Sequence, residues 1–176
     1  MGMQTYVSLL RGVNVGGRIV KMADLKTCYE KVGCRDVVTL LQSGNVIFSS
    51  KLPSAKAVQA KLEAAVSKQF GYPAKILVYR QDELKPLAEA YPFDSSDENF
   101  QHYIIFLRPQ LAQKLVAAAV DLNSKIEQVA AGNDVVYWRV QKGMTLQSKF
   151  GKTLSRPAFK DFHTNRNLKT VRKLVV

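Results

Sequence analysis

Apolar and polar residues follow two periodicities along the first 80 residues, and together these predict six elements. Four stretches rich in β-branched and aromatic residues are expected to be strands, and two stretches repeat apolar residues at helical spacing. A Ser-Gly-Asn turn joins the second and third strands into a hairpin. The resulting order, βαββαβ, is that of a ferredoxin-like unit. The expected strands are residues 3–10, 35–42, 45–50 and 74–80, and the expected helices are residues 22–32 and 54–70.

The second half of the chain repeats most of this pattern. A short helix over residues 81–90 leads into a stretch rich in proline, aspartate and serine, which is typical of a linker. A strand, a helix and a second hairpin follow, and the turn of this hairpin again contains Gly-Asn. We therefore expect an α+β protein with a ferredoxin-like subdomain over residues 1–92 and a related βαββα subdomain over residues 93–176.

The chain is expected to end in an amphipathic helix with Thr164 as its N-cap. The apolar residues of this segment fall on one side of the predicted helix, and the basic residues fall on the other. The apolar side consists of Leu168, Val171 and Val175, and the basic side consists of Arg166, Lys169 and Lys173. The helix is therefore predicted to pack through one side and to expose a basic stripe on the other.

Positive charge is concentrated near the C-terminus. Residues 139–176 contain ten Lys and Arg against the single acid Asp161, a net charge of +9 out of +12 for the whole chain. A local excess of this size attracts polyanions. The candidate nucleic-acid contacts, made through phosphate groups, are Arg166, Lys169, Arg172 and Lys173. A basic surface that only keeps the protein in solution is the alternative.

The segment "RGVNVGGRIVK", residues 11–21, is a glycine-rich loop between the first strand and the first helix. It matches the start of the P-loop pattern, but Arg18 and Ile19 replace the lysine and hydroxyl residue that hold phosphate and magnesium. Its glycine spacing also differs from the dinucleotide-binding pattern. Two interpretations stand: a loop whose backbone N–H groups bind an anion, and a structural turn that needs glycine at positive φ.

Other patterns of catalysis and metal binding are missing from the sequence. No Gly-x-Ser-x-Gly turn occurs, and Cys28 and Cys34 lack the spacing and the neighbouring histidines of a zinc site. We therefore expect no metal and no cofactor, and the sequence leaves open whether the protein is an enzyme. Because no apolar stretch could span a bilayer and no signal peptide is visible, we expect a cytoplasmic protein with no membrane partner.

Four segments resemble a known family, and three of them carry the polar motifs considered below. The stretches "LLRGVNVGG", "KMADL" and "LLQSGNVIF" are similar to the bacterial family catalogued as domain of unknown function 1697, and the ending "TNRNLKTVRKL" resembles that family's C-terminus. Leu168 stands where the family usually has tryptophan. The resemblance implies two α+β subdomains, of which the first is ferredoxin-like, and it implies no established activity.

The sequence supports two hypotheses about function. The first is a non-catalytic binding protein for an anionic partner, with nucleic acid as the first choice. The second is an enzyme or sensor that acts on a small phosphorylated or carboxylated metabolite. The candidate ligand-binding residues come from the three family-like motifs and the lysine that ends the glycine loop: Arg11, Gly12, Asn14, Gly16, Gly17, Lys21, Gln42, Ser43, Asn45, Arg166 and Asn167.

Overall fold

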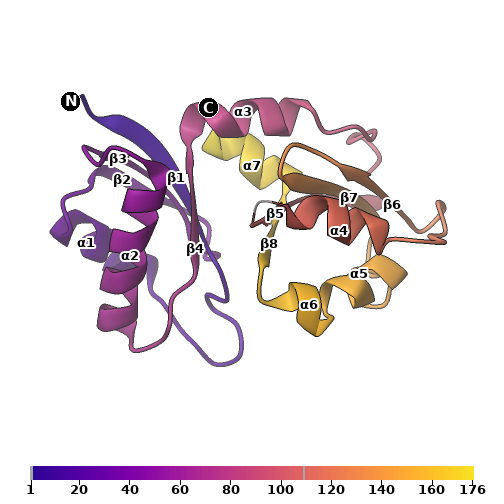
Figure 1. Cartoon of the computed structure of the whole chain (residues 1–176), viewed down its shortest axis with the longest axis horizontal. Coiled ribbons are helices and arrows are strands. Elements are labelled where there is room, and N and C mark those ends of the chain that lie inside the picture. Colours follow the sequence, from indigo (N-terminus) through magenta and orange to yellow (C-terminus); the bar gives the residue numbers. More distant parts are fainter. Residues whose placement is uncertain (1, 109) are drawn as a thin grey trace. The chain divides into compact units, whose positions relative to one another are not determined.

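The computed structural model of the chain describes residues 2–108 and 110–176, which divide into two compact units. The first unit runs to Leu84, and the second runs from Lys85 to Leu174. Each unit is built around one four-stranded antiparallel sheet with helices packed against it (Figure 1). Among the described residues, no helix combines the length and the apolar character that crossing a membrane requires.

The first unit has the predicted ferredoxin-like order of elements. Its elements are β1 (Gln4–Leu10), α1 (Met22–Lys31), β2 (Arg35–Leu40), β3 (Asn45–Ser50), α2 (Ala55–Phe70) and β4 (Ile76–Arg80). The strands pair in the spatial order β2-β3-β1-β4, and β1 is antiparallel to both of its neighbours. The α+β fold and the ferredoxin-like character expected for this half are thereby confirmed. Because β1 and β3 are antiparallel neighbours, the end of β1 lies beside the turn that precedes β3.

Helices α1 and α2 pack beside each other on the sheet of the first unit (Figure 1). Tyr29 of α1 and Leu62 of α2 are buried against strand residues that include Phe48. The rings of Tyr29 and Phe48 meet edge to face at 5.2 Å, a favourable geometry for aromatic pairs. Ser54 caps α2, because its side chain accepts a hydrogen bond from the backbone N–H of Ala57. This core holds β1 and β3 in fixed register.

The second unit repeats the same architecture. Helix α3 (Gln81–Glu89) leads into it, and its further elements are β5 (Phe100–Leu107), α4 (Leu111–Ala117), β6 (Glu127–Ala131), β7 (Val135–Gln141), α5 (Lys149–Leu154), α6 (Pro157–Lys160), β8 (His163–Asn167) and α7 (Leu168–Leu174). The strands pair in the order β6-β7-β5-β8, so β5 takes the central place that β1 holds in the first unit. The unit therefore has one strand more than the predicted βαββα order.

The extra strand corrects the predicted C-terminal helix. The helix was expected to start at Thr164, but residues His163–Asn167 form β8 and α7 begins at Leu168. Thr164 pairs with Phe106 of β5, and the side chain of Asn167 accepts a hydrogen bond from the backbone N–H two residues later. Both Thr and Asn are good N-cap residues, so capping preference alone does not distinguish the two starts. The pairing of residues 163–167 with β5 makes them a strand, so the helix begins only at Leu168.

The core of the second unit lies between its sheet and helices α4 and α5. Trp138 is fully buried there, and its ring contacts Tyr103 and Phe150. Its indole N–H donates to the buried carboxylate of Glu127, which also accepts the backbone N–H of Phe150. Because side chains alternate along a strand, His102 lies on the opposite face of β5 from Tyr103. That opposite face carries the site described below.

Candidate functional site

Two of the family-like motifs lie side by side in the first unit. Leu9 at the end of β1 pairs with Asn45 at the start of β3, and the backbone N–H of Leu10 donates to the carbonyl of Gly44 at 2.9 Å. The glycine loop that follows β1 therefore begins next to the Ser-Gly-Asn turn. The side chain of Asn14 links the two segments directly, since it donates to the carbonyl of Gln42.

The glycine loop is held by its own hydrogen bonds. Positive φ angles occur at Gly12, Asn14, Gly16 and Gly17, which explains the three glycines and the asparagine. The side-chain oxygen of Asn14 also accepts the backbone N–H of Val20 at 2.9 Å, so Asn14 closes the loop. These features fit the structural interpretation of the loop, because both polar atoms of the exposed Asn14 side chain bond to the protein backbone.

The other polar side chains of the two motifs are divided between internal and exposed positions. Arg18 donates to the carbonyl of Gly12 at 3.3 Å, and its guanidinium lies 4.0 Å from the ring centre of Tyr72. The buried Asn45 donates to the hydroxyl of Ser43 and to the carbonyl of Leu40. The exposed or half-buried candidates in this region are Arg11, Lys21, Gln42 and Ser43.

The third motif lies in the second unit, where the structure changes the interpretation of Arg166. Arg166 was predicted on the exposed side of a helix, but it belongs to β8 and is only 8% exposed. It donates to the hydroxyl of Thr164 and to the carbonyl of Asn165. Burial lowers its pKa to about 10, because desolvation disfavours the charged form. The exposed basic side chains of α7 are therefore Lys169, Arg172 and Lys173.

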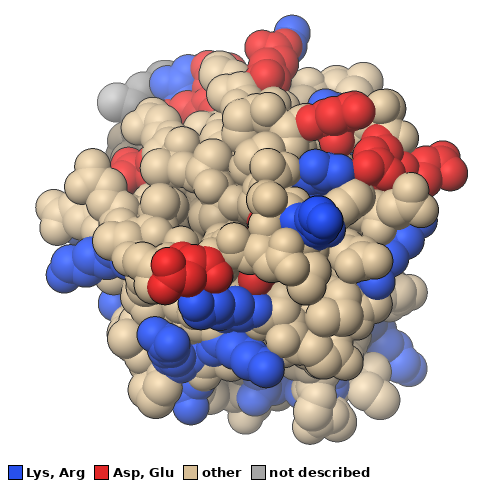
Figure 2. Space-filling view, turned by 90° about the vertical axis from the view of Figure 1, so that its right-hand side faces the viewer, with Lys and Arg blue, Asp and Glu red and all other residues tan. Residues whose placement is uncertain are grey.

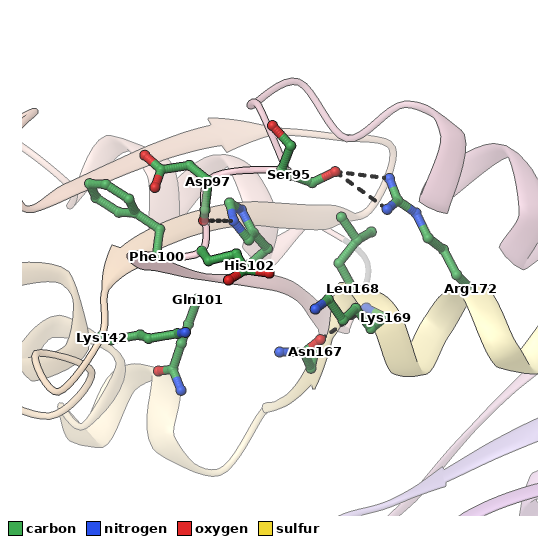
Figure 3. Close-up of a pocket in the computed structure, with 12 residues that line it drawn as sticks. Ser95, Asp97, Phe100, Gln101, His102, Lys142, Asn167, Leu168, Lys169 and Arg172 are labelled. Atoms are coloured by element: carbon green, nitrogen blue, oxygen red, sulfur yellow. Dashed lines mark hydrogen bonds between the residues drawn. The ribbon is translucent and has the colours of Figure 1, made fainter.

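A cavity of about 400 Å³ lies in the second unit against the start of α7. We call it the α7 pocket (Figure 3). One wall comes from the segment between α3 and β5, a second from the first residues of β5, and a third from α7. The lining residues are Ser95, Ser96, Asp97, Glu98, Phe100, Gln101, His102, Lys142, Asn167, Leu168, Lys169 and Arg172.

Three cations line the α7 pocket, and none of them has a carboxylate partner in the part of the chain that the structure describes. Arg172 donates through both terminal nitrogens to the hydroxyl of Ser95, at 3.3 Å each, as Figure 3 shows. Among the described residues, no Asp or Glu lies within ion-pair distance of Lys142, Lys169 or Arg172. Unpaired cations that converge on one cavity are suited to hold an anion.

One of the two acids that line the pocket, Asp97, is already paired within the protein. Asp97 forms an ion pair with Arg139 at 2.9 Å, and the guanidinium of Arg139 also stacks on the ring of Phe100 at 3.6 Å. Hydrogen bonds from the backbone and side chain of Asn99, together with Arg139, hold the pKa of Asp97 below its usual range. Asp97 is therefore a charged group that is already paired, and the other charges that line the cavity are three cations and Glu98.

Sequence reasoning found only part of this pocket. Asn167, Lys169 and Arg172 were among the candidates, whereas Lys142, His102 and the serines of the linker were not. The residues that line the pocket come from four separate stretches of the chain, and no sequence spacing pattern connects these stretches. The acidic linker adjoins the basic helix in the fold, and this proximity between residues 77 positions apart has no signal in a single sequence.

The positive charge near the C-terminus is partly balanced by acidic residues that belong to the same unit. Residues 1–84 contain 12 Lys and Arg against 6 acids, and residues 85–176 contain 14 against 8, so each part carries +6. Figure 2 shows blue Lys and Arg side chains interspersed with red Asp and Glu on the face that it displays. The acids of the linker and hairpin thus share a unit with the basic C-terminal residues.

Comparisons with known proteins name no activity, and one solved structure agrees with the fold. A family model described as "Protein of unknown function (DUF1697)" matches residues 3–137. A solved structure of the conserved bacterial protein SP0830 from Streptococcus pneumoniae is similar, with a TM-score of 0.81 and 25% identity over 99% of this chain and 98% of that chain. A protein from Galdieria sulphuraria gives a TM-score of 0.29 and 14% identity over 94% and 99%. No curated protein matches.

Proposed function

The chain belongs to the DUF1697 family of proteins of unknown function, and from that premise we propose that its second unit binds a small phosphorylated or carboxylated metabolite in the α7 pocket. The observation that carries this proposal is the convergence of Lys142, Lys169 and Arg172 on one cavity without carboxylate partners among the described residues. A bound anion would neutralise like charges that otherwise repel one another.

The chemistry of the lining also supports an oxygen-rich anion. Arg172 presents a planar set of donors that suits phosphate and carboxylate oxygens, and Ser95 keeps it in place. Lysine adds a compact charge with three donors, and serine hydroxyls and the Asn167 amide also line the pocket. A volume of about 400 Å³ lies within the range of ordinary small-molecule sites.

A nucleic acid is the competing partner, and the distribution of charge supports it less. Only three exposed basic side chains remain on α7, and two of them, Lys169 and Arg172, line the pocket. A polymer usually requires a continuous basic surface that follows many phosphates. The equal charge of the two parts of the chain provides no such concentration in the second unit.

Thermal unfolding of the full chain tests the proposal with two small anions, a neutral sugar and a DNA duplex. We expect ribose 5-phosphate or citrate to raise the melting temperature of the protein, because a ligand at 100 times its Kd stabilises the folded state by about 2.7 kcal/mol. Neutral ribose is the control and is expected to cause no shift. No shift with either anion would contradict the proposal, and a larger shift with a DNA duplex than with both anions would favour nucleic acid.

A further inference from the structure

His102 is a buried imidazole in the wall of the α7 pocket, and both of its ring nitrogens face oxygen atoms. The side chain lines the cavity, and the residue is only 7% exposed. Nδ1 lies 3.0 Å from the hydroxyl of Tyr91. Nε2 lies 3.3 Å from the carbonyl oxygen of Asp97 (Figure 3). The ring is therefore held from both sides at the edge of the anion-binding cavity.

The number of hydrogens available to these contacts depends on the charge of His102. A backbone carbonyl only accepts, so Nε2 carries a hydrogen and donates to Asp97. The hydroxyl of Tyr91 also lies 3.1 Å from the carbonyl oxygen of Trp138. In neutral His102, Nδ1 has no hydrogen and competes with that carbonyl for the one proton of Tyr91.

The cationic form satisfies every group in the same geometry. Nδ1 then donates to Tyr91, Tyr91 donates to Trp138, and Nε2 donates to Asp97. Burial raises the pKa of Tyr91 well above its usual value, so Tyr91 keeps its proton at neutral pH and serves as donor and acceptor together. Gain of a proton by His102 therefore requires no rearrangement of the wall.

Charges of both signs face this imidazole from the surrounding elements. Asp94 and Asp97 precede β5, and hydrogen bonds from Ser96 hold the pKa of Asp94 below its usual range, with smaller contributions from Arg139 and His102. Tyr137 and Arg139 lie on β7. The other charged groups that line the pocket are Glu98, Lys142, Lys169 and Arg172. Because Asp97 is already paired with Arg139, a bound anion would add a new negative charge that faces both the three cations and this imidazole.

We infer that His102 takes up a proton when a dianion binds in the α7 pocket, so that anion binding and protonation of this histidine strengthen each other. The inference rests on the proposed function, since it needs an anion in that pocket. Linkage is reciprocal: the anion favours the cationic imidazole, and the cationic imidazole favours the anion. The enhancement is therefore complete at low pH and is lost as the pH rises through the titration of His102 in the complex.

Sulfate is the probe that isolates this effect, because it stays doubly charged between pH 5.5 and 8.0. Isothermal titration of the full chain at constant ionic strength is expected to give about tenfold tighter sulfate binding at pH 5.5 than at pH 8.0. The variant His102→Asn should bind with nearly equal affinity at both pH values. The matched control His163→Asn removes the other histidine, which lies outside the pocket, and should keep the pH dependence.

A second measurement uses the unaltered protein, so the inference does not depend on folding of the variant. Imidazole signals in an NMR titration should show that sulfate moves the titration midpoint of His102 upward by about one pH unit and leaves that of His163 in place. Sulfate binding with the same affinity at both pH values and an unmoved midpoint would overturn the inference while the proposed function stands. Absence of binding by sulfate, ribose 5-phosphate and citrate would overturn both.

Discussion

The double substitution Lys169→Ala/Arg172→Ala is expected to weaken binding of ribose 5-phosphate by about 100-fold. Both side chains line the α7 pocket, and Arg172 is held by the hydroxyl of Ser95. A hydrogen bond to a charged group contributes roughly 1.5–3 kcal/mol, so each lost cation should reduce the affinity by about tenfold or more. Isothermal titration of the full chain at low ionic strength measures the effect.

Lys173 provides the matched control for this experiment. It lies on the same helix and is exposed, but it does not line the pocket. Lys173→Ala removes one positive charge, as Lys169→Ala and Arg172→Ala each do. We expect it to change the affinity for ribose 5-phosphate by less than about twofold, because a distant exposed charge is screened by salt. Equal losses for Lys173→Ala and Arg172→Ala would show that general attraction, and not the pocket, holds the anion.

Gly44→Ala is expected to destabilise the first unit by about 3 kcal/mol. Gly44 has a φ of +73°, and a Cβ atom there would lie 2.7 Å from Cβ of Leu10 and 3.3 Å from a methyl carbon of Val13. The positive φ costs a non-glycine residue about 1–2 kcal/mol, and overpacking against a fixed strand adds roughly 1–3 kcal/mol. Native-state hydrogen exchange of the β3 amides of Val46 and Phe48 measures the free energy of opening of this unit.

Gly71→Ala separates the two causes. Gly71 ends α2 with a φ of +70°, but nothing lies within 4 Å of the position that its Cβ would take. We therefore expect this variant to lose only the backbone contribution, about 1 kcal/mol. If both variants lost the same free energy, close packing between the Ser-Gly-Asn turn and the end of β1 would not be the reason for glycine at position 44.

The first half of the fold could be predicted because local and global signals coincide there. The alternating strands, the helical repeat of α2 and its Ser54 cap all indicate one arrangement, which the structure confirms. Strand β8 could not be predicted in this way. Its sequence, His163 to Asn167, is polar, and its strand form comes from pairing with β5, some 60 residues earlier in the chain.

The motifs of the first unit and the α7 pocket also differ in how far the sequence could predict them. The sequence indicated both motifs of the first unit, and their proximity follows from the pairing of β1 with β3. Asn14 and Asn45 in these motifs form hydrogen bonds within the protein. These two candidate ligand-binding residues therefore maintain the local structure of their loops. The α7 pocket instead combines a linker, a strand, Lys142 and a helix, and only the tertiary fold brings them together.

Mapping of backbone amide shifts on the full chain with ribose 5-phosphate tests the central claim most directly. The probe is added in steps, with ribose as the neutral control. We expect saturable shifts at amides that surround the α7 pocket, including Ser95, Gln101, Lys142 and Lys169. Shifts confined to the glycine loop at residues 11–21 and the turn at residues 42–45 would contradict the assignment and would place anion binding in the first unit.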